Sequence, residues 1–344
     1  MAKGGDSVKS MLLPGDMRSG LFPEKDDGTY IFLCGGTGLL RRETLRILKN
    51  RFARECDEFY SIYGGNELCA LNIPQKNAVI ADSVYFGCNG GNYPKPNLIF
   101  LSLDDFSDIH PKFETPETNK SENAFAVFNE SCKRYLCASA AAKKVLNTEA
   151  EKSLDKRRVV DYSVRFLKRS GIVKTEKKSC PKFLRASAVT PWGVECICDE
   201  FEKCETVFVI KDECGALSNE LISAMCVRLR KFGESYQVFF CSLGGLSEHL
   251  IIPSLSVGFF TENSSHKYDF PNRRNLSAAR FLLPQSELLK STAIPSALLG
   301  EFLDEAVFSL FEATRNMFST EKKLSEGREN TSLLCAEKIL TNFF

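Results

Sequence analysis

Hydrophobic residues near the start of the chain follow two different periods in turn. The apolar run Tyr30–Cys34 is typical of a strand that is buried on both faces of a parallel sheet. Between residues 39 and 55, the apolar residues Leu45, Leu48 and Phe52 recur at helical spacing, and lysine and arginine fill much of the remainder. This pattern predicts a buried strand followed by an amphipathic, basic helix.

Strand-like and helix-like patterns then alternate along the rest of the chain. Further strands are predicted at 59–63, 78–82, 98–103, 207–210, 237–241 and 257–260. Helices are predicted at 124–146, 150–169, 296–319 and 331–344. Strands that alternate with helices indicate βαβ units and a parallel sheet.

The chain also repeats itself. Four residues of the segment from Gly38 to Arg51 recur 177 positions later, as Gly38 and Gly215, Leu40 and Leu217, Glu43 and Glu220, and Arg51 and Arg228. Downstream, Leu71–Pro74 corresponds to Leu250–Pro253 at an offset of 179. Solenoid repeats have periods of roughly 20 to 50 residues, so this longer repeat predicts two related lobes.

The first copy carries an altered phosphate-binding loop. A working loop reads G-x-x-x-x-G-K-[ST], in which glycines expose backbone N–H groups, lysine reaches the terminal phosphates and the hydroxyl holds magnesium. The loop at 35–42 keeps early glycines but has Leu40 at the last glycine and arginines at the lysine and hydroxyl positions. The candidate nucleotide contacts are Gly35, Gly36, Gly38, Arg41 and Arg42. An ordinary strand-to-helix turn is the alternative.

The second copy departs further from the phosphate-binding pattern. Its loop, at 212–219, begins with Asp212 and Glu213 and has Ser218 at the lysine position. Two carboxylates at this place repel a polyphosphate. The remaining candidate contacts are Lys211, Gly215 and Ser218, and an ordinary turn is again the alternative.

Asp82 is the candidate magnesium ligand. It ends the apolar run 78–82, as the acid of a second nucleotide motif ends a buried strand. Its counterpart at an offset of 179 is Thr261. Acids are common at strand ends, so the magnesium hypothesis depends on a competent loop beside Asp82.

These observations predict an α/β fold with two related P-loop NTPase-like lobes that contain parallel sheets, each followed by a helical hairpin. The expected segments are a first lobe at 1–112, a helical hairpin and basic linker at 113–182, a second lobe at 183–290 and a C-terminal helical hairpin at 291–344.

The chain resembles an uncharacterised bacterial family of tandem P-loop ATPase-like proteins over nearly its whole length. The resemblance rests on the two loops and on four segments: Asn97–Phe106, Ser187–Gly193, Val209–Lys211 and Glu248–Pro253. The usual family loop is K-G-G-P-G-T-G-K-S/T in each lobe. The resemblance implies a doubled nucleotide-binding fold, and the altered loops of this chain place ATPase activity in doubt.

Charge and cysteine content refine this interpretation. The formal net charge is only +1, yet the segment 151–185 holds twelve lysines and arginines against four acids. This basic segment is either a solvated helix face with a linker or a surface for an anionic partner. The fourteen cysteines are scattered through apolar segments, and no run approaches the ~18 apolar residues of a membrane span, which predicts a cytoplasmic protein with free thiols.

Two further groups were weighed as chemical sites. Cys196, Cys198 and Cys204 lack the paired C-x2-C spacing of structural zinc sites. His249 is expected to be a neutral histidine satisfied by local backbone.

The predicted function is that of a pseudoenzyme, a non-catalytic binding or regulatory module with degenerate nucleotide sites. One alternative is a weak NTPase or kinase-like enzyme that holds ATP and magnesium in the first lobe through Arg41 and Asp82. Another is an adaptor for anions or nucleic acid that uses the basic segment 151–185.

Overall fold

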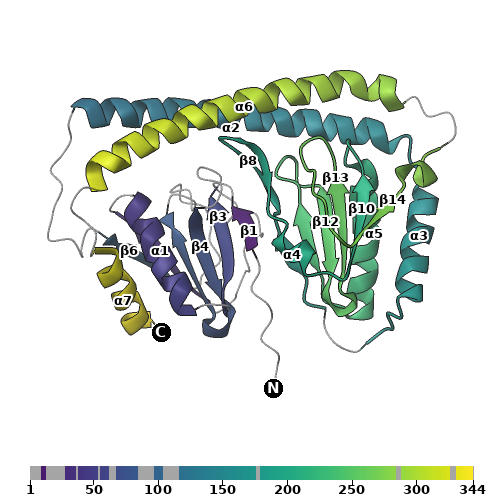
Figure 1. The fold of residues 1–344 in the computed structure, drawn as a ribbon, viewed down its shortest axis with the longest axis horizontal. Helices are drawn as coiled ribbons and strands as arrows, with labels where there is room; N and C mark the ends of the chain where they lie inside the picture. The colour runs from purple at the N-terminus through teal and green to yellow at the C-terminus, as the bar shows by residue number, and fades with distance from the viewer. Residues whose placement is uncertain are drawn as a thin grey trace. The chain divides into compact units, whose positions relative to one another are not determined.

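The computed structural model describes residues 9–12, 28–35, 38–52, 55–61, 67–83, 97–103, 116–175, 179–283, 288–325 and 331–343. It is a mixed α/β structure whose sheets contain parallel strands, as the sequence predicts. Its residues form two compact units, the first made of Met1–Ser131 with Phe308–Phe344 and the second of Cys132–Val307 (Figure 1). The segment boundaries expected from the sequence stay a prediction.

The first unit contains a six-stranded sheet in the order β1-β3-β4-β5-β2-β6. Strand β4 runs antiparallel to both of its neighbours, and the other neighbouring pairs are parallel. The bounds are Lys9–Leu12 (β1), Thr29–Cys34 (β2), Asp57–Ser61 (β3), Leu68–Ile73 (β4), Ala78–Asp82 (β5) and Asn97–Ser102 (β6).

The second unit contains a six-stranded sheet in the order β7-β11-β12-β13-β10-β14. Here β12 is the strand that runs antiparallel to both neighbours. The bounds are Lys182–Leu184 (β7), Thr206–Lys211 (β10), Gln237–Phe240 (β11), Ser247–Ile252 (β12), Val257–Glu262 (β13) and Arg273–Leu276 (β14). A separate two-stranded ribbon is formed by Ser187–Thr190 (β8) and Gly193–Cys196 (β9).

Small irregularities occur at corresponding places in the two sheets. The register shifts between Phe59 and Tyr60 in the first sheet and between Phe239 and Phe240 in the second. A single 3₁₀ turn joins β4 to β5 at Pro74–Lys76, and another joins β12 to β13 at Pro253–Leu255. Each turn is followed by a residue in the left-handed region, Asn77 at φ 50° and Ser256 at φ 53°.

The antiparallel strands refine the expectation of parallel sheets, because each sheet is mixed. A parallel pair needs a crossover connection of a dozen or more residues. The turns Pro74–Lys76 and Pro253–Leu255 are three residues long, so each can only join antiparallel neighbours. The hydrophobic runs alone did not distinguish the two directions, because strands buried on both faces look alike in sequence.

The helices pack differently from the hairpins expected from the sequence. Helix α7 follows the second sheet in the chain but packs on α1 of the first unit, and α3 packs on α5 of the second unit. No described helix is long and apolar enough to cross a membrane. The bounds are Gly38–Phe52 (α1), Pro116–Glu151 (α2), Lys156–Arg169 (α3), Asp199–Glu202 (α4), Ala216–Phe232 (α5), Leu288–Ser325 (α6) and Thr331–Phe343 (α7).

The predicted helical periods account for these contacts. In α1, Leu45 and Leu48 are fully buried against the first sheet, and α7 adds Ile339 to the same core. In α5, Leu221 and Met225 lie in the core of the second unit. An apolar stripe on one helix face is thus buried against a sheet, while a second helix covers part of the remaining surface.

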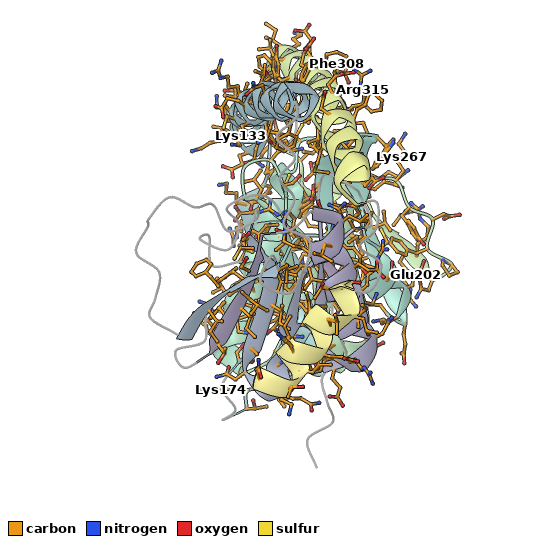
Figure 2. All side chains as sticks on the ribbon, turned by 90° about the vertical axis from the view of Figure 1, so that its left-hand side faces the viewer. Lys133, Lys174, Glu202, Lys267, Phe308 and Arg315 are labelled. Atoms are coloured by element: carbon orange, nitrogen blue, oxygen red, sulfur yellow. The ribbon has the colours of Figure 1, made fainter. Side chains whose placement is uncertain are left out.

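The basic segment 151–185 divides between surface and interior. Lys174 is exposed (Figure 2), as are most of the lysines and arginines of α3. Arg185, in contrast, is buried. An anionic partner for the exposed part stays a prediction.

Replacing Ile339 by alanine tests whether α7 completes the core of the first unit. Ile339 is 0% exposed, so we expect Ile339→Ala to lower the free energy of unfolding of this unit by about 2–5 kcal/mol, measured by urea denaturation. Leu334→Ala is the control, because Leu334 on the same helix is 52% exposed and its loss should cost under about 1 kcal/mol. Equal losses for the two variants would contradict this packing.

Candidate functional site

The turn between β10 and α5 is closed by its own carboxylate. Asp212 Oδ1 accepts a hydrogen bond from the backbone N–H of Gly215 at 2.9 Å. Asp212 Oδ2 accepts from the backbone N–H of Ser218 at 2.8 Å and from its hydroxyl at 3.0 Å. Backbone N–H groups at a helix start are the groups that bind phosphate in a phosphate-binding loop. In this turn, the N–H groups of Gly215 and Ser218 already bind the carboxylate of Asp212.

The other predicted contacts of this loop take structural roles. Gly215 adopts φ 78°, a left-handed conformation that favours glycine. Ser218 is fully buried against Asp212. The side chain of Lys211 is 70% exposed, and its Nζ lies 3.8 Å from Glu262 Oε2.

In the first unit, the predicted phosphate and magnesium residues bind each other. Arg41 Nε lies 2.9 Å from Asp82 Oδ1, and both side chains are largely buried. Arg41 Nη1 also donates to the carbonyl of Gly35 at 2.7 Å, which ties the arginine to the start of the turn. The structure therefore brings Arg41 and Asp82 together as an ion pair.

The structure also describes Gly35, Gly38 and Arg42 of the first loop. Gly38 is buried at the first position of α1, and Leu40 lies in the core of the first unit. Arg42 Nε forms an ion pair with Glu67 Oε2 at 3.0 Å. Gly35 adopts φ 66°, and Gly36 lies outside the described residues.

A cavity of about 840 Å³ lies beside the second turn, entirely within the second unit. It adjoins the carboxyl ends of β10 and β13 and the start of α5, which is where open α/β sheets bind their ligands. Its walls come from α2, the β10–α5 turn, the 241–243 and 263–266 loops and α6. The charged residues on these walls are Lys143, Lys211, Asp212, Glu213, Glu248 and Asp304.

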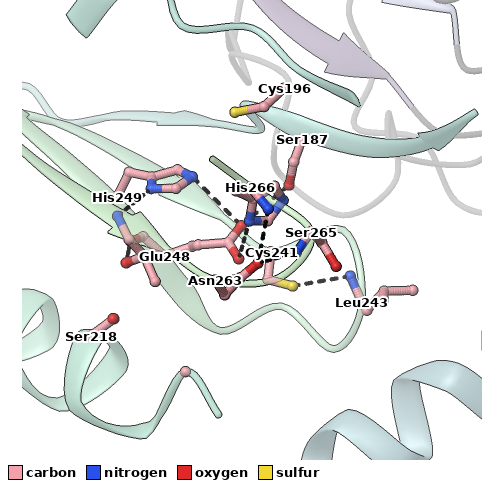
Figure 3. Close-up of polar contacts among 12 residues, drawn as sticks. Ser187, Cys196, Ser218, Cys241, Leu243, Glu248, His249, Asn263, Ser265 and His266 are labelled. Carbon is pink, nitrogen blue, oxygen red and sulfur yellow. Dashed lines mark hydrogen bonds and ion pairs between the residues drawn. The ribbon is translucent and has the colours of Figure 1, made fainter. Parts of the chain in front are cut away.

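Figure 3 shows a group of buried polar residues around Glu248, which together with His266 lines the cavity. Glu248 Oε1 lies 3.4 Å from His266 Nδ1, and Glu248 Oε2 lies 3.7 Å from His249 Nε2. The hydroxyl of Ser187 donates to Glu248 Oε2 at 3.2 Å. Glu248 thus accepts a hydrogen bond from Ser187 of β8 and lies close to the two imidazoles, which do not donate to it in this structure.

The local sequence holds these side chains in place. His249 stacks on Phe260 of the neighbouring strand with ring centroids 4.5 Å apart. The 263–266 loop is fixed by Asn263 Oδ1, which accepts from the backbone N–H groups of Ser265 and His266 at 2.9 and 3.0 Å. His266 is therefore positioned by a turn of the Asx type.

Burial decides the charges of this group. It lowers the pKa of His249 to about 3 against the opposing effect of Glu248, and it also lowers the pKa of His266. Burial alone would raise the pKa of Glu248, but the two imidazoles, Lys143 and the Ser187 hydrogen bond together lower it below its ordinary value. At neutral pH the group is an ionised carboxylate between two neutral imidazoles.

The tautomer of His249 argues against a metal centre. Ligand atoms of Glu248, His249 and His266 lie within 4.8 Å of one another, a donor set that zinc accepts. However, His249 Nδ1 accepts a hydrogen bond from the backbone N–H of Thr261 at 3.0 Å, so the ring proton is on Nε2, the atom that faces Glu248. A metal-binding histidine needs the reverse, with a lone pair toward the metal and the proton on the far nitrogen.

The two cysteines on the cavity wall, Cys214 and Cys241, do not supply a nucleophile. Burial, together with the charge of Glu248, raises the pKa of Cys241 to about 12, and burial, together with the charge of Asp212, raises the pKa of Cys214 to about 11. At neutral pH both are thiols, and the thiolate is the reactive form of cysteine. The arrangement is thus suited to binding through charge and hydrogen bonds.

This chain matches no protein-family model, no curated protein and no solved structure.

The sequence did not reveal this cavity. Lys143, Glu248 and His266 are far apart in the chain and belong to no short motif. His249 was expected to be a neutral histidine satisfied by backbone, and the structure agrees, since Thr261 of the adjacent strand supplies that backbone N–H. The second loop, with Lys211, Asp212 and Glu213, was the sequence signal that pointed to this edge of the sheet.

Removing the Asp212 carboxylate tests its role at the α5 turn. Asp212→Ala leaves the N–H groups of Gly215 and Ser218 without their acceptor, so we expect a loss of about 1–2 kcal/mol in the free energy of unfolding. Urea denaturation of Asp269→Ala provides the comparison. The Asp269 side chain is 93% exposed, and its loss should cost about 0.5 kcal/mol or less. Similar small losses in both variants would show that Asp212 does not hold the turn.

The buried His249 should make stability depend on pH. Its pKa is about 3 in the folded protein and about 6.5 when unfolded, so the unfolded state binds the extra proton first as pH falls. The contribution of the neutral His249 to the free energy of unfolding is present above pH ~6.5 and is lost progressively toward pH ~3. Between pH 7 and 5 this loss is about 2 kcal/mol.

His249→Phe keeps the stacking on Phe260 and removes the titrating group. Urea denaturation at pH 7 and pH 5 should therefore show a smaller loss for this variant than for the unmodified chain, by about 2 kcal/mol. An identical pH dependence in the two proteins would mean that His249 is not held neutral by burial.

Proposed function

We propose that this chain is a two-lobed protein of the tandem P-loop ATPase-like kind, with degenerate nucleotide sites, and that it acts as a non-catalytic binding or regulatory module. The corresponding strand orders, register shifts and left-handed turn residues of the two sheets support a duplicated lobe. Repeated irregularities are more informative than repeated strands, because nothing in a generic α/β sheet requires a bulge at one particular place.

The observation that carries the proposal is the Asp212 carboxylate at the start of α5. A triphosphate at this turn would have to displace Asp212 from the N–H groups of Gly215 and Ser218. Two unit charges at 4 Å repel each other by about 4 kcal/mol at the effective dielectric of a protein surface. The turn therefore favours the carboxylate that it already holds over a polyphosphate.

The ion pair of the first unit supports the same conclusion. Arg41 and Asp82 would have to separate before either could bind phosphate or magnesium. Separation of a largely buried pair leaves two uncompensated charges, and breaking such pairs costs about 3–5 kcal/mol. The enzyme alternative requires an ATP and magnesium site in the first lobe. Forming that site would first require this free energy to separate Arg41 from Asp82.

A binding role is supported by the cavity beside the second turn. At about 840 Å³ it has the size of a small-molecule site, and it combines apolar walls with a few buried polar groups. The proposed duplicated fold thus lacks phosphate contacts at the turn and offers a cavity directly beside it.

Calorimetric titration with Mg-ATP, Mg-GTP and Mg-ADP tests this function. We expect no saturable binding tighter than about 1 mM, because both turns are occupied by side chains of the protein. No sustained release of phosphate from ATP is expected either. Tight binding of nucleotide at both lobes, with turnover that Arg41→Ala abolishes, is the result that would overturn the proposal.

Asp82→Asn provides the control for the enzyme alternative. Any phosphate release that comes from a magnesium site in the first lobe must fall in this variant. Release that persists at the same rate in Asp82→Asn comes from a contaminant or another site.

A further inference from the structure

Lys143 places a positive charge on the cavity wall without an ion-pair partner. The residue extends from α2 and is 7% exposed. Its Nζ donates to the backbone carbonyl of Glu213 at 3.1 Å, and no carboxylate within the described part of the chain forms an ion pair with it. A buried ammonium loses several kcal/mol of hydration, and carboxylates or bound anions usually compensate for that loss. The position of Lys143 therefore indicates a place for a ligand anion.

His266 presents a hydrogen-bond acceptor to the same cavity. Its Nδ1 faces Glu248 Oε1 at 3.4 Å, so the ionised carboxylate favours the tautomer with the proton on Nδ1. Neither ring nitrogen of His266 has a hydrogen-bond partner among the described residues although the residue is buried, and with the proton on Nδ1 it is Nε2 that carries the lone pair. Buried polar atoms are nearly always satisfied, which indicates a donor supplied by a ligand.

Glu248 positions His266 and does not itself need a ligand. Its oxygens face the two imidazoles and accept from Ser187. The charge of Lys143 is close enough to lower the pKa of both Glu248 and His266. The cation and the acceptor therefore belong to one site.

The rest of the cavity restricts the ligand further. Leucines and a valine from α2, α6 and the 241–243 loop give it an apolar side: Leu146, Leu243, Leu299, Leu303 and Val307. Asp212 and Glu213 also line the cavity, and the backbone carbonyl of Glu213 accepts the hydrogen bond from Lys143. Of the two lysines on the walls, Lys211 is largely exposed and lies 3.8 Å from Glu262, which leaves Lys143 as the buried cation. A single buried cation among acids tolerates one negative charge and repels a polyphosphate.

We propose that this cavity binds an organic monoanion that has an apolar body and also carries a hydroxyl or amino group. Lys143 pairs with the anionic group, and Nε2 of His266 accepts a hydrogen bond from the hydroxyl or amine. This inference rests on the proposed function, since it names the class of ligand for a binding module whose nucleotide sites are degenerate.

Three small probes that share a phenyl ring separate the two contacts. Mandelate carries both a carboxylate and a hydroxyl, phenylacetate lacks the hydroxyl, and 1-phenylethane-1,2-diol lacks the carboxylate. Binding is measured by NMR titration of the protein at probe concentrations up to about 10 mM, since fragments of this size bind weakly. We expect mandelate to bind about tenfold or more tightly than either of the other two.

Two variants assign the contacts. Lys143→Met keeps the length of the side chain and removes the charge, so the preference for mandelate over the diol should disappear while the preference over phenylacetate remains. His266→Phe keeps a ring and removes the acceptor, so the opposite pattern is expected. A purely structural role would weaken all three probes equally, which would overturn the assignment.

Lys144→Met is the matched control, because Lys144 is the next residue of α2 and is exposed. It should leave all three affinities unchanged. If Lys143→Met does not fold, Lys143→Arg replaces it; the retained charge should preserve the preference for mandelate over the diol, and loss of that preference in a folded Lys143→Arg would count against the proposal.

Mg-ATP in the same titration separates failure of this inference from failure of the proposed function. Binding of none of the three probes, or equal binding of all three, with no binding of Mg-ATP overturns the ligand class alone. Binding of Mg-ATP in the cavity in place of mandelate overturns both.

Discussion

The carboxylate of Asp212 at the first turn of α5 is the contact on which the properties of the second unit depend. The first turn of any helix leaves backbone N–H groups without partners, and these groups attract an anion. A phosphate-binding loop leaves that place open for a ligand, whereas this turn fills it with a residue of its own. The helix start is then satisfied in the absence of any ligand, and binding has to use other groups.

In the first unit, a positively charged side chain instead of a carboxylate binds the groups of the corresponding turn. At the position of Asp212 stands Gly35, whose carbonyl accepts from Arg41 while that arginine also pairs with Asp82. In the second unit, the carboxylate of Asp212 binds the N–H groups of the turn. In the first unit, Arg41 binds the carboxylate of Asp82 on the neighbouring strand. Each solution stabilises the scaffold through groups that a nucleotide site would keep available, which is why the fold and the chemistry can separate.

Sequence patterns predicted many of the elements, but they missed strands β4 and β12 and did not predict how the strands pair. The runs around Tyr30 and Val207 predicted buried strands, and helical spacing predicted α1 with its core residues. The antiparallel course of β4 and β12 depends on the length of a turn, which hydrophobicity does not encode. The packing of α7 on α1 is a contact between the two ends of the sequence, and local periodicity contains no information about it.

The site was less predictable than the fold for a related reason. The altered loops were visible in sequence because each is a short segment, but the cavity depends on Lys143, Glu248 and His266 converging from three distant places. The negative charge of the second loop was nevertheless visible in the sequence as Asp212 and Glu213, which predict that a polyphosphate is repelled. The sequence did not indicate that the Asp212 carboxylate accepts hydrogen bonds from backbone N–H groups at the start of α5.

The separation between residues along the chain gives the two halves of the cavity different folding histories. The hairpin of β12 and β13 brings His249 to the backbone of Thr261 across only 12 positions, so closing that loop costs little chain entropy. Lys143 reaches the carbonyl of Glu213 across 70 positions and arrives only when α2 docks. The carboxylate and imidazoles therefore come from one short stretch of the chain, while the ammonium is supplied by a helix 70 positions away from the turn that it contacts.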